Sequence, residues 1–243
     1  MRRFLLVYYL PMKTINVISW NIFAGKDIPG VIRLLKKENP DFIALQEILA
    51  EKDGSNNQAA VIAEALGYTY IFASAHMLNP GGSYVLDYFG IERDMQWGNA
   101  LVSRLPFKSS RTHRLSENLG RIMIEGCVDV EGEVLNLFST HLVGGDEERH
   151  DAVRLEQARS LVALIPKNRS IIMGDFNAPP ESPVISVLKD VVENTDPTPP
   201  FVSTRKGQKI DYIFTTADIH TRSHDTFASQ ASDHLPVGAE LSF

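Results

Sequence analysis

Short apolar runs rich in β-branched residues alternate with polar turns along the chain, and this pattern predicts more strands than helices. The runs at 14–20 and 41–45 are apolar at consecutive positions, which is typical of strands buried on both faces. A turn at Glu131 and Gly132 predicts a hairpin between its two flanking runs. The pattern predicts further strands at 68–73, 99–103, 122–130, 134–140, 170–173, 210–215 and 237–241.

Helix signals fall between these strands. Asp27 is placed to cap a helix that ends before Pro40. Ser55 and Gln58 have the spacing of a capping box, followed by a helix at 57–66 with Gly67 at its carboxyl end. The same signals predict a helix at 147–164 and a short helix that starts at 182–183.

Residues 76–98 show neither the helical nor the strand periodicity of apolar residues, and they hold two glycines and several aromatic residues. We therefore expect a long irregular loop there. Strands outnumber helices and some look antiparallel, which favours an α/β fold of mixed sheets covered by helices. We expect a single domain at 13–243, preceded by an amino-terminal extension at 1–12.

Composition narrows the class of protein. The 243 residues are 44% hydrophobic and 22% charged, which excludes a disordered tail or a fibre. The net charge of -6 argues against general adhesion to nucleic acid or to anionic membranes. Cys127 is the only cysteine, so neither an intrachain disulfide nor a cysteine-ligated zinc site can form.

The amino-terminal sequence bears on localisation. Two arginines precede an apolar run at 4–10, as in a signal peptide, but the run is short and no A-x-A-like cleavage site follows. The run is also far too short to span a bilayer. We therefore expect a cytoplasmic protein, with secretion as the less favoured alternative.

Amide, carboxylate and imidazole groups recur where the apolar runs stop. Polar residues end strands in many proteins, because turns favour Asn and Asp, and this accounts for any single position. It accounts poorly for the whole set, which contains no Ser, Lys or Thr. The set consists of Asn21, Glu47, His141, Asp175, Asn177, Asp211, Asp233 and His234.

These groups suit one kind of chemistry. Carboxylate and amide oxygens are ligands for a hard cation such as Mg²⁺ or Mn²⁺. A histidine beside a carboxylate forms an oriented acid or base, and further histidine and asparagine groups can donate to developing negative charge. A metal, a base and oxyanion donors together indicate hydrolysis of a phosphate ester.

Eight segments closely resemble the endonuclease/exonuclease/phosphatase superfamily of metal-dependent phosphohydrolases, in the family's order and over nearly the whole chain. The resemblance implies a four-layer α/β sandwich with two mixed sheets face to face and helices outside. The segments are SWNI (19–22), LQE (45–47), GNALVSR (98–104), GR (120–121), STHL (139–142), GDFN (174–177), IDYIF (210–214) and SDHLPV (232–237).

The resemblance implies a metal site and a group that handles the attacking water. Asn21 and Glu47 look like metal ligands, and Asp233 is placed to touch the metal or its waters. Asp175 matches the residue that aligns or deprotonates the water, whereas His234 matches the imidazole near the scissile phosphate. Which of Asp175 and His234 is the general base stays open.

Further positions match groups that bind the phosphate. Asp211 resembles the carboxylate that orients the imidazole, and His141 and Asn177 resemble donors that stabilise the transition state. Asn99 and Arg121 resemble contacts to the substrate phosphate or to neighbouring acids. Other histidines, among them His224, match no motif and are expected at the surface.

The substrate branch is less defined. The abasic-site branch of the family is expected to have a tyrosine-containing strand where this chain has STHL. This chain has His141 there and no Tyr, so it looks more like sphingomyelinases, tyrosyl-DNA phosphodiesterases and deadenylases. We expect a phosphodiesterase that acts on a phosphate-ester substrate, with a DNA or RNA nuclease as the alternative. A basic groove would favour the nuclease, and an apolar rim at 84–97 would favour a lipid substrate. A non-catalytic binding module is the rival from another class.

Overall fold

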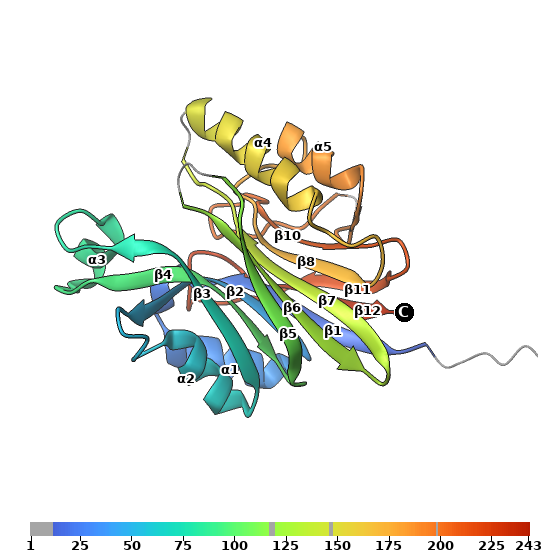
Figure 1. Ribbon diagram of the computed structural model, residues 1–243, viewed down its shortest axis with the longest axis horizontal. Coiled ribbons are helices and arrows are strands. Elements are labelled where there is room, and N and C mark those ends of the chain that lie inside the picture. Colours follow the sequence, from blue (N-terminus) through green and yellow to red (C-terminus); the bar gives the residue numbers. More distant parts are fainter. Residues whose placement is uncertain (1–11, 117–119, 146–147, 198) are drawn as a thin grey trace, which may run out of the picture.

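Two six-stranded sheets lie face to face at the centre of the molecule (Figure 1). The computed structural model describes residues 12–116, 120–145, 148–197 and 199–243. The predicted extension at 1–12 falls, apart from Met12, outside the described residues. Within the described residues, no helix is long and apolar enough to cross a bilayer.

The first sheet is mixed and has the strand order β11-β12-β1-β2-β4-β3. Its β1 and β2 pair in parallel, and its other neighbours pair antiparallel. The strands are β1 (Thr14–Asn21), β2 (Phe42–Glu51), β3 (Thr69–Leu78), β4 (Met95–Ser103), β11 (His220–Thr226) and β12 (Val237–Ser242).

The second sheet is also mixed and has the order β5-β6-β7-β8-β10-β9. Here β7 and β8 form the parallel pair, and β6 and β7 form the predicted hairpin. The strands are β5 (Phe107–Arg114), β6 (Ile122–Val130), β7 (Glu133–His141), β8 (Ser170–Asp175), β9 (Glu193–Asn194) and β10 (Asp211–Thr215).

Helices cover the outer face of each sheet (Figure 1). On the first sheet these are α1 (Ile28–Glu38) and α2 (Gln58–Leu66), and on the second they are α4 (Glu148–Val162) and α5 (Pro183–Lys189). A 3-10 turn (Phe23–Gly25) follows β1, and a short helix α3 (Tyr84–Phe89) lies between β3 and β4. The predicted four-layer α/β sandwich is therefore confirmed.

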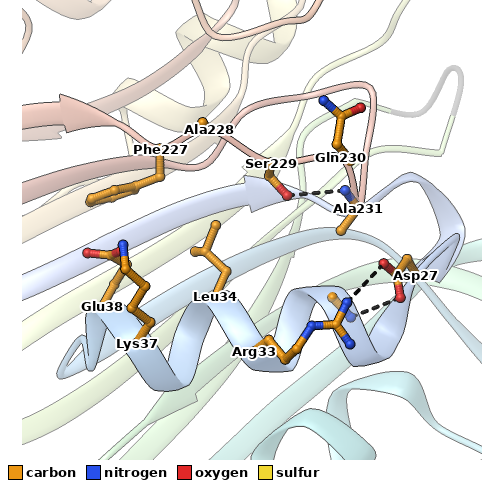
Figure 2. Close-up of a pocket in the computed structure, with 11 residues that line it drawn as sticks. Asp27, Arg33, Leu34, Lys37, Glu38, Phe227, Ala228, Ser229, Gln230 and Ala231 are labelled. Carbon is orange, nitrogen blue, oxygen red and sulfur yellow. Dashed lines mark hydrogen bonds and ion pairs between the residues drawn. The ribbon is translucent and has the colours of Figure 1, made fainter.

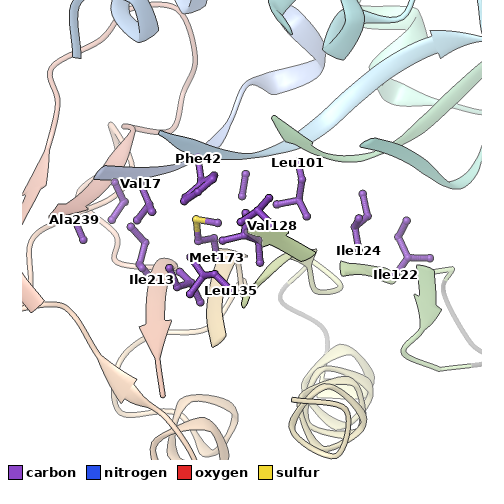
Figure 3. Close-up of a cluster of buried hydrophobic side chains, with 14 of the residues drawn as sticks. Val17, Phe42, Leu101, Ile122, Ile124, Val128, Leu135, Met173, Ile213 and Ala239 are labelled. Carbon is purple, nitrogen blue, oxygen red and sulfur yellow. The ribbon is translucent and has the colours of Figure 1, made fainter. Parts of the chain in front are cut away.

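Three apolar clusters hold the layers together. The central cluster fills the space between the sheets, where Phe42 and Leu101 of the first sheet face Met173 and Ile213 of the second (Figure 3). The other two clusters lie between each sheet and its helices. Because both sheets are covered on both faces, their central strands are apolar at consecutive positions, as the sequence showed.

The start of α2 differs from the predicted capping box. Asn57 is the cap, and its side chain accepts from Ala59 N and Ala60 N. Gln58 instead accepts from Leu49 N at 2.9 Å and donates to Ala24 O at 2.8 Å. Tertiary partners for the amide thus replace the local capping contact.

The stretch at 76–98 is not the irregular loop that the sequence predicted. β3 runs on to Leu78 and β4 begins at Met95, so both ends of the stretch belong to a hairpin, and α3 lies in the connection between them. Three strands were also not predicted, β5, β9 and β11, and all three lie at sheet edges. β5 and β11 are mostly polar and exposed, and β9 has only two residues.

Gly174 of β8 leaves no room for a side chain. A Cβ atom there would lie 2.2 Å from the carbonyl oxygen of Thr140 on β7. We expect Gly174→Ala to lower the free energy of unfolding by about 1–3 kcal/mol, measured by urea denaturation. Gly82→Ala is the control, because the nearest atom to its Cβ would be 3.8 Å away. Equal losses in the two variants would contradict the steric explanation.

Candidate active site

Strand register in the second sheet brings three of the predicted residues side by side. His141 ends β7 opposite Asp175, which ends β8, and Asp175 is in turn opposite Asp211, the first residue of β10. All three side chains are buried. Neighbouring strands in a sheet are about 5 Å apart, so this register alone places an imidazole and two carboxylates within reach of one another.

The first sheet contributes Asn21 and Glu47. Asn21 is the last residue of β1. The sequence suggested that Glu47 ends its strand, but β2 continues to Glu51. Glu47 lies in a bulge between Leu45 and Ile48 and has a φ of 60°. Asn177 also has a positive φ, of 48°. Bulges and left-handed backbone of this kind re-aim side chains and are concentrated at functional sites.

Asn21 joins the two sheets. Its Nδ2 donates to Glu47 Oε1 and to Asp175 Oδ2, each at 3.1 Å. Its Oδ1 accepts from Phe23 N at 3.0 Å, so the amide oxygen is already used locally. The structure therefore brings Asn21 to the predicted place as a bridge between two carboxylates, and its role as a metal ligand stays a prediction.

His234 and Asp211 form a hydrogen-bonded pair. His234 Nδ1 lies 2.9 Å from Asp211 Oδ2, and its Nε2 lies 3.8 Å from Asp175 Oδ2. Trp20 Nε1 fixes the backbone by donating to His234 O at 3.1 Å. Burial opposes protonation, but the negative charge and hydrogen bond of Asp211 outweigh it and raise the pKa of His234 to about 10.

His141 and Asn177 form a second pair, in which Asn177 Nδ2 lies 3.0 Å from His141 Nε2. Asn177 N also donates to Asp175 Oδ1 at 2.9 Å. Burial, together with the positive charges of Arg121 and His234, holds the pKa of His141 well below its ordinary value. His141 is therefore a neutral imidazole, suited to hydrogen bonding near a phosphate.

Trp97 was not predicted as a site residue, although it directly precedes the GNALVSR segment. The guanidinium of Arg121 lies 4.5 Å from the centre of its ring, and the ring of His141 lies 5.2 Å away. Burial lowers the pKa of Arg121 to about 10, whereas Glu47 and Asp175 oppose that change. Arg121 thus lies where its positive charge acts on both carboxylates.

Asn99 and Asp233, the two remaining predicted site residues, make different kinds of contact. Asn99 is buried and donates to Ile122 O at 3.4 Å, which is a structural contact between sheets. Asp233 directly precedes His234, accepts from Ser232 Oγ at 3.3 Å and acts electrostatically on Glu47 and His234. Their predicted roles toward substrate and metal stay predictions.

Buried carboxylates make the site suitable for a cation. Burial raises the pKa of Glu47, and burial together with the charge of Asp211 raises that of Asp175 to about 7. Both shifts show negative charge that the protein's own cations do not fully offset, and a divalent cation would offset it. The residues present therefore fit a metal.

The structure also indicates a second arrangement for a cation. Ligand atoms of Asp175, Asp211 and His234 lie within 4.8 Å of one another. This group differs from the predicted ligand set of Glu47, Asn21 and Asp233. In it, His234 Nδ1 is already bonded to Asp211, which favours an acid–base pair over a pair of metal ligands.

His224 is buried, so the prediction that it lies at the surface is wrong. Its Nε2 lies 2.9 Å from Asp196 Oδ1, which also accepts from Lys209 Nζ at 2.6 Å. Burial raises the pKa of Asp196, but the hydrogen bond of His224 and the charge of Lys209 outweigh it and lower the pKa. No sequence motif marks this cluster, and its members lie far apart in the chain.

A pocket of about 400 Å³ lies apart from these residues, between α1 and the segment 227–231 (Figure 2). Its charged groups are satisfied within the protein: Arg33 lies 3.7 Å from Asp27, which also accepts from Gly30 N. Its lining contains none of the predicted site residues. The strand ends described above therefore form the candidate active site.

Comparison with known proteins finds a longer relative. The chain is 27% identical over 188 residues to Protein angel homolog 2 of Danio rerio, covering 72% of this chain and 30% of that protein. It thus spans about a third of that relative's length.

Solved structures show the same fold at low sequence identity. An endonuclease/exonuclease/phosphatase from Beutenbergia cavernae gives a TM-score of 0.78 at 21% identity, over 94% of this chain and 71% of that one. The human Nocturnin catalytic domain gives 0.74 at 21% identity, over 96% and 97%. The model of the Endonuclease/Exonuclease/phosphatase family matches residues 18–234, and the chain belongs to this family.

Proposed function

We propose that the chain hydrolyses phosphodiesters with the help of a divalent cation, Mg²⁺ or Mn²⁺. Membership of the family supports a hydrolase of this type. The observation that carries the proposal is the hydrogen-bonded connection from Glu47 through Asn21 to Asp175, beside the pair His234 and Asp211. A non-catalytic binding module would not need a buried, electrostatically strained set of this kind.

Glu47 is the proposed principal ligand of the cation, with Asn21 and Asp233 beside it. Glu47 is half-buried, its carboxylate lies next to Asn21, and burial raises its pKa in the absence of metal. A bound cation would polarise the phosphate and offset the charge of the leaving oxygen. Asp175 accepts from the same Asn21 Nδ2 and also lies beside His234, so it is the proposed partner of the attacking water.

Water activation is assigned to the adjoining groups. Asp175 Oδ2 and His234 Nε2 are 3.8 Å apart, so both can contact one water molecule. Asp211 orients the imidazole of His234, as in other acid–base pairs. Neutral His141 and Asn177 would donate to the equatorial oxygens of the phosphate, and Arg121 would add positive charge.

A nuclease remains the second candidate, but two of the arginine side chains do not support it. A basic groove would favour a nuclease, but Arg104 pairs with Asp41 at 3.0 Å and lies over Tyr68. That pair is at the start of β2, several residues from Glu47 along the strand. Arg121 is half-buried and lies over the Trp97 ring, so neither arginine extends a groove for a long polyanion.

Metal dependence tests the proposal. We expect the protein to hydrolyse bis-p-nitrophenyl phosphate with Mg²⁺ or Mn²⁺, and to lose the activity when EDTA is present. The release of p-nitrophenol at 405 nm provides the assay. Restoration by excess Mg²⁺ is the control for damage by the chelator. Full activity in EDTA, or none with any divalent cation, would contradict the proposal.

A further inference from the structure

A cavity of about 570 Å³ adjoins Asn177. Asn177 also contacts His141 of the candidate active site, so the cavity and the site share this residue. The other walls come from the loop after β7, from α4 and from the segment before β10. Substrate atoms beyond the scissile phosphate therefore have space in this direction.

The charged residues of the wall are mostly positive. Arg154, Lys206 and Lys209 line the cavity, against one carboxylate, Asp151. This is notable in a chain of net charge -6. Arg154 is buried, donates to Val143 O at 2.8 Å and pairs with Asp151 at 2.5 Å, so its charge is offset within the wall and its guanidinium is held in place.

Two polar side chains in the wall are free to bind a ligand. Lys206 and Gln208 make no side-chain hydrogen bond or ion pair within residues 12–116, 120–145, 148–197 and 199–243. Lys209 Nζ uses one of its donors on Asp196, at 2.6 Å. The Lys209 side chain is buried and its ammonium group also lies 4.7 Å from the centre of the Tyr212 ring, so Lys206 and Gln208 are the open donors of the wall.

The turn that presents Lys206 is fixed to the catalytic segment. Arg205 N donates to Asp233 O at 2.9 Å, and Leu235 N donates to Ser203 O at 2.8 Å. Gly207, with φ of 82°, closes the turn. Lys206 is thus attached through its neighbours to the strand segment that carries His234, which is the rigid support that a specificity residue needs.

We propose that this cavity is a subsite for a second anionic group of the substrate, a phosphate that lies beside the phosphodiester being cleaved. The inference rests on the proposed function and extends it to a substrate class. Lys206 contacts the second phosphate directly, Gln208 donates to it, and Lys209 in the wall adds to the local positive charge. Phosphate is the fitting group, because several oxygens can accept from several donors at once.

A matched pair of substrates tests the subsite. Thymidine 5′-(p-nitrophenyl phosphate) and the same compound with a 3′-phosphate differ only in the second anion. We expect wild-type kcat/KM to be about tenfold or more higher for the 3′-phosphorylated compound, mainly through KM. Lys206→Glu should remove this preference, and Gln208→Leu should reduce it.

Bis-p-nitrophenyl phosphate, which has no second anion, should be hydrolysed by Lys206→Glu with unchanged kcat. Lys167→Glu makes the same charge change at an exposed lysine before β8 and should keep the preference. Equal kcat/KM for the two nucleotides in the wild type, or an unaltered preference in Lys206→Glu, would overturn the subsite. If the wild type hydrolyses none of the three compounds in the presence of metal, the proposed function itself is refuted.

Discussion

Replacement of Glu47 by glutamine is expected to lower kcat for bis-p-nitrophenyl phosphate by about 10³-fold, because a metal ligand supplies several kcal/mol of transition-state stabilisation. The fold should persist, since the substitution removes a carboxylate whose pKa burial already raises. We therefore expect a melting temperature without metal that is equal to or higher than that of the wild type.

The same variant should lose stabilisation by metal. A cation that binds only the folded state raises the melting temperature as its concentration rises. We expect this rise with Mg²⁺ in the wild type and its loss in Glu47→Gln, measured by calorimetry. Glu51→Gln is the matched control, because Glu51 ends the same strand and pairs with Arg93 at 3.1 Å. Normal activity in Glu47→Gln would exclude Glu47 as the principal ligand.

Replacement of His234 by alanine is expected to reduce kcat by roughly 10²–10⁴, the usual contribution of a positioned acid or base. The imidazole lies 3.8 Å from Asp175, and within the part of the chain that the structure describes His234 is the histidine paired with Asp211. His220→Ala, at an exposed position on β11, is the control and should keep full activity. Retained activity in His234→Ala would contradict the proposed acid–base role.

Asp211→Asn tests how His234 is tuned. The charge of Asp211 raises the pKa of His234 to about 10, against the opposing effect of burial. Without that charge, burial dominates, so the imidazolium should lose its proton at a markedly lower pH than in the wild type. NMR titration of the His234 ring in metal-free protein measures this change. An unchanged His234 pKa in Asp211→Asn would show that the pair is not electrostatically coupled.

Several features of the fold were predictable from the chain alone, because they depend on local sequence. The apolar runs marked the central strands, since a strand covered on both faces must be apolar at successive positions. Asp27 and Ser182 cap their helices as predicted, accepting from Gly30 N and Ile185 N. A cap needs only a side chain and an amide two or three residues away, so neighbouring residues suffice to define it.

Edge strands and tertiary contacts could not be predicted in this way. β5 and β11 face solvent and therefore have no apolar pattern to report them. His224 appeared to be a surface residue because its partners, Asp196 and Lys209, are close only after the chain folds. Burial of a polar group depends on such partners, and sequence spacing does not reveal them.

By itself, the sequence determined which chemical groups this protein has at the ends of its strands, and in which order. Only the tertiary structure decided how they meet. The pairing register of β7, β8 and β10 aligns His141, Asp175 and Asp211, and the bulge in β2 turns Glu47 toward Asn21. Register and bulges arise from hydrogen bonds between strands that are distant in the chain, so apolar periodicity within one strand does not specify them.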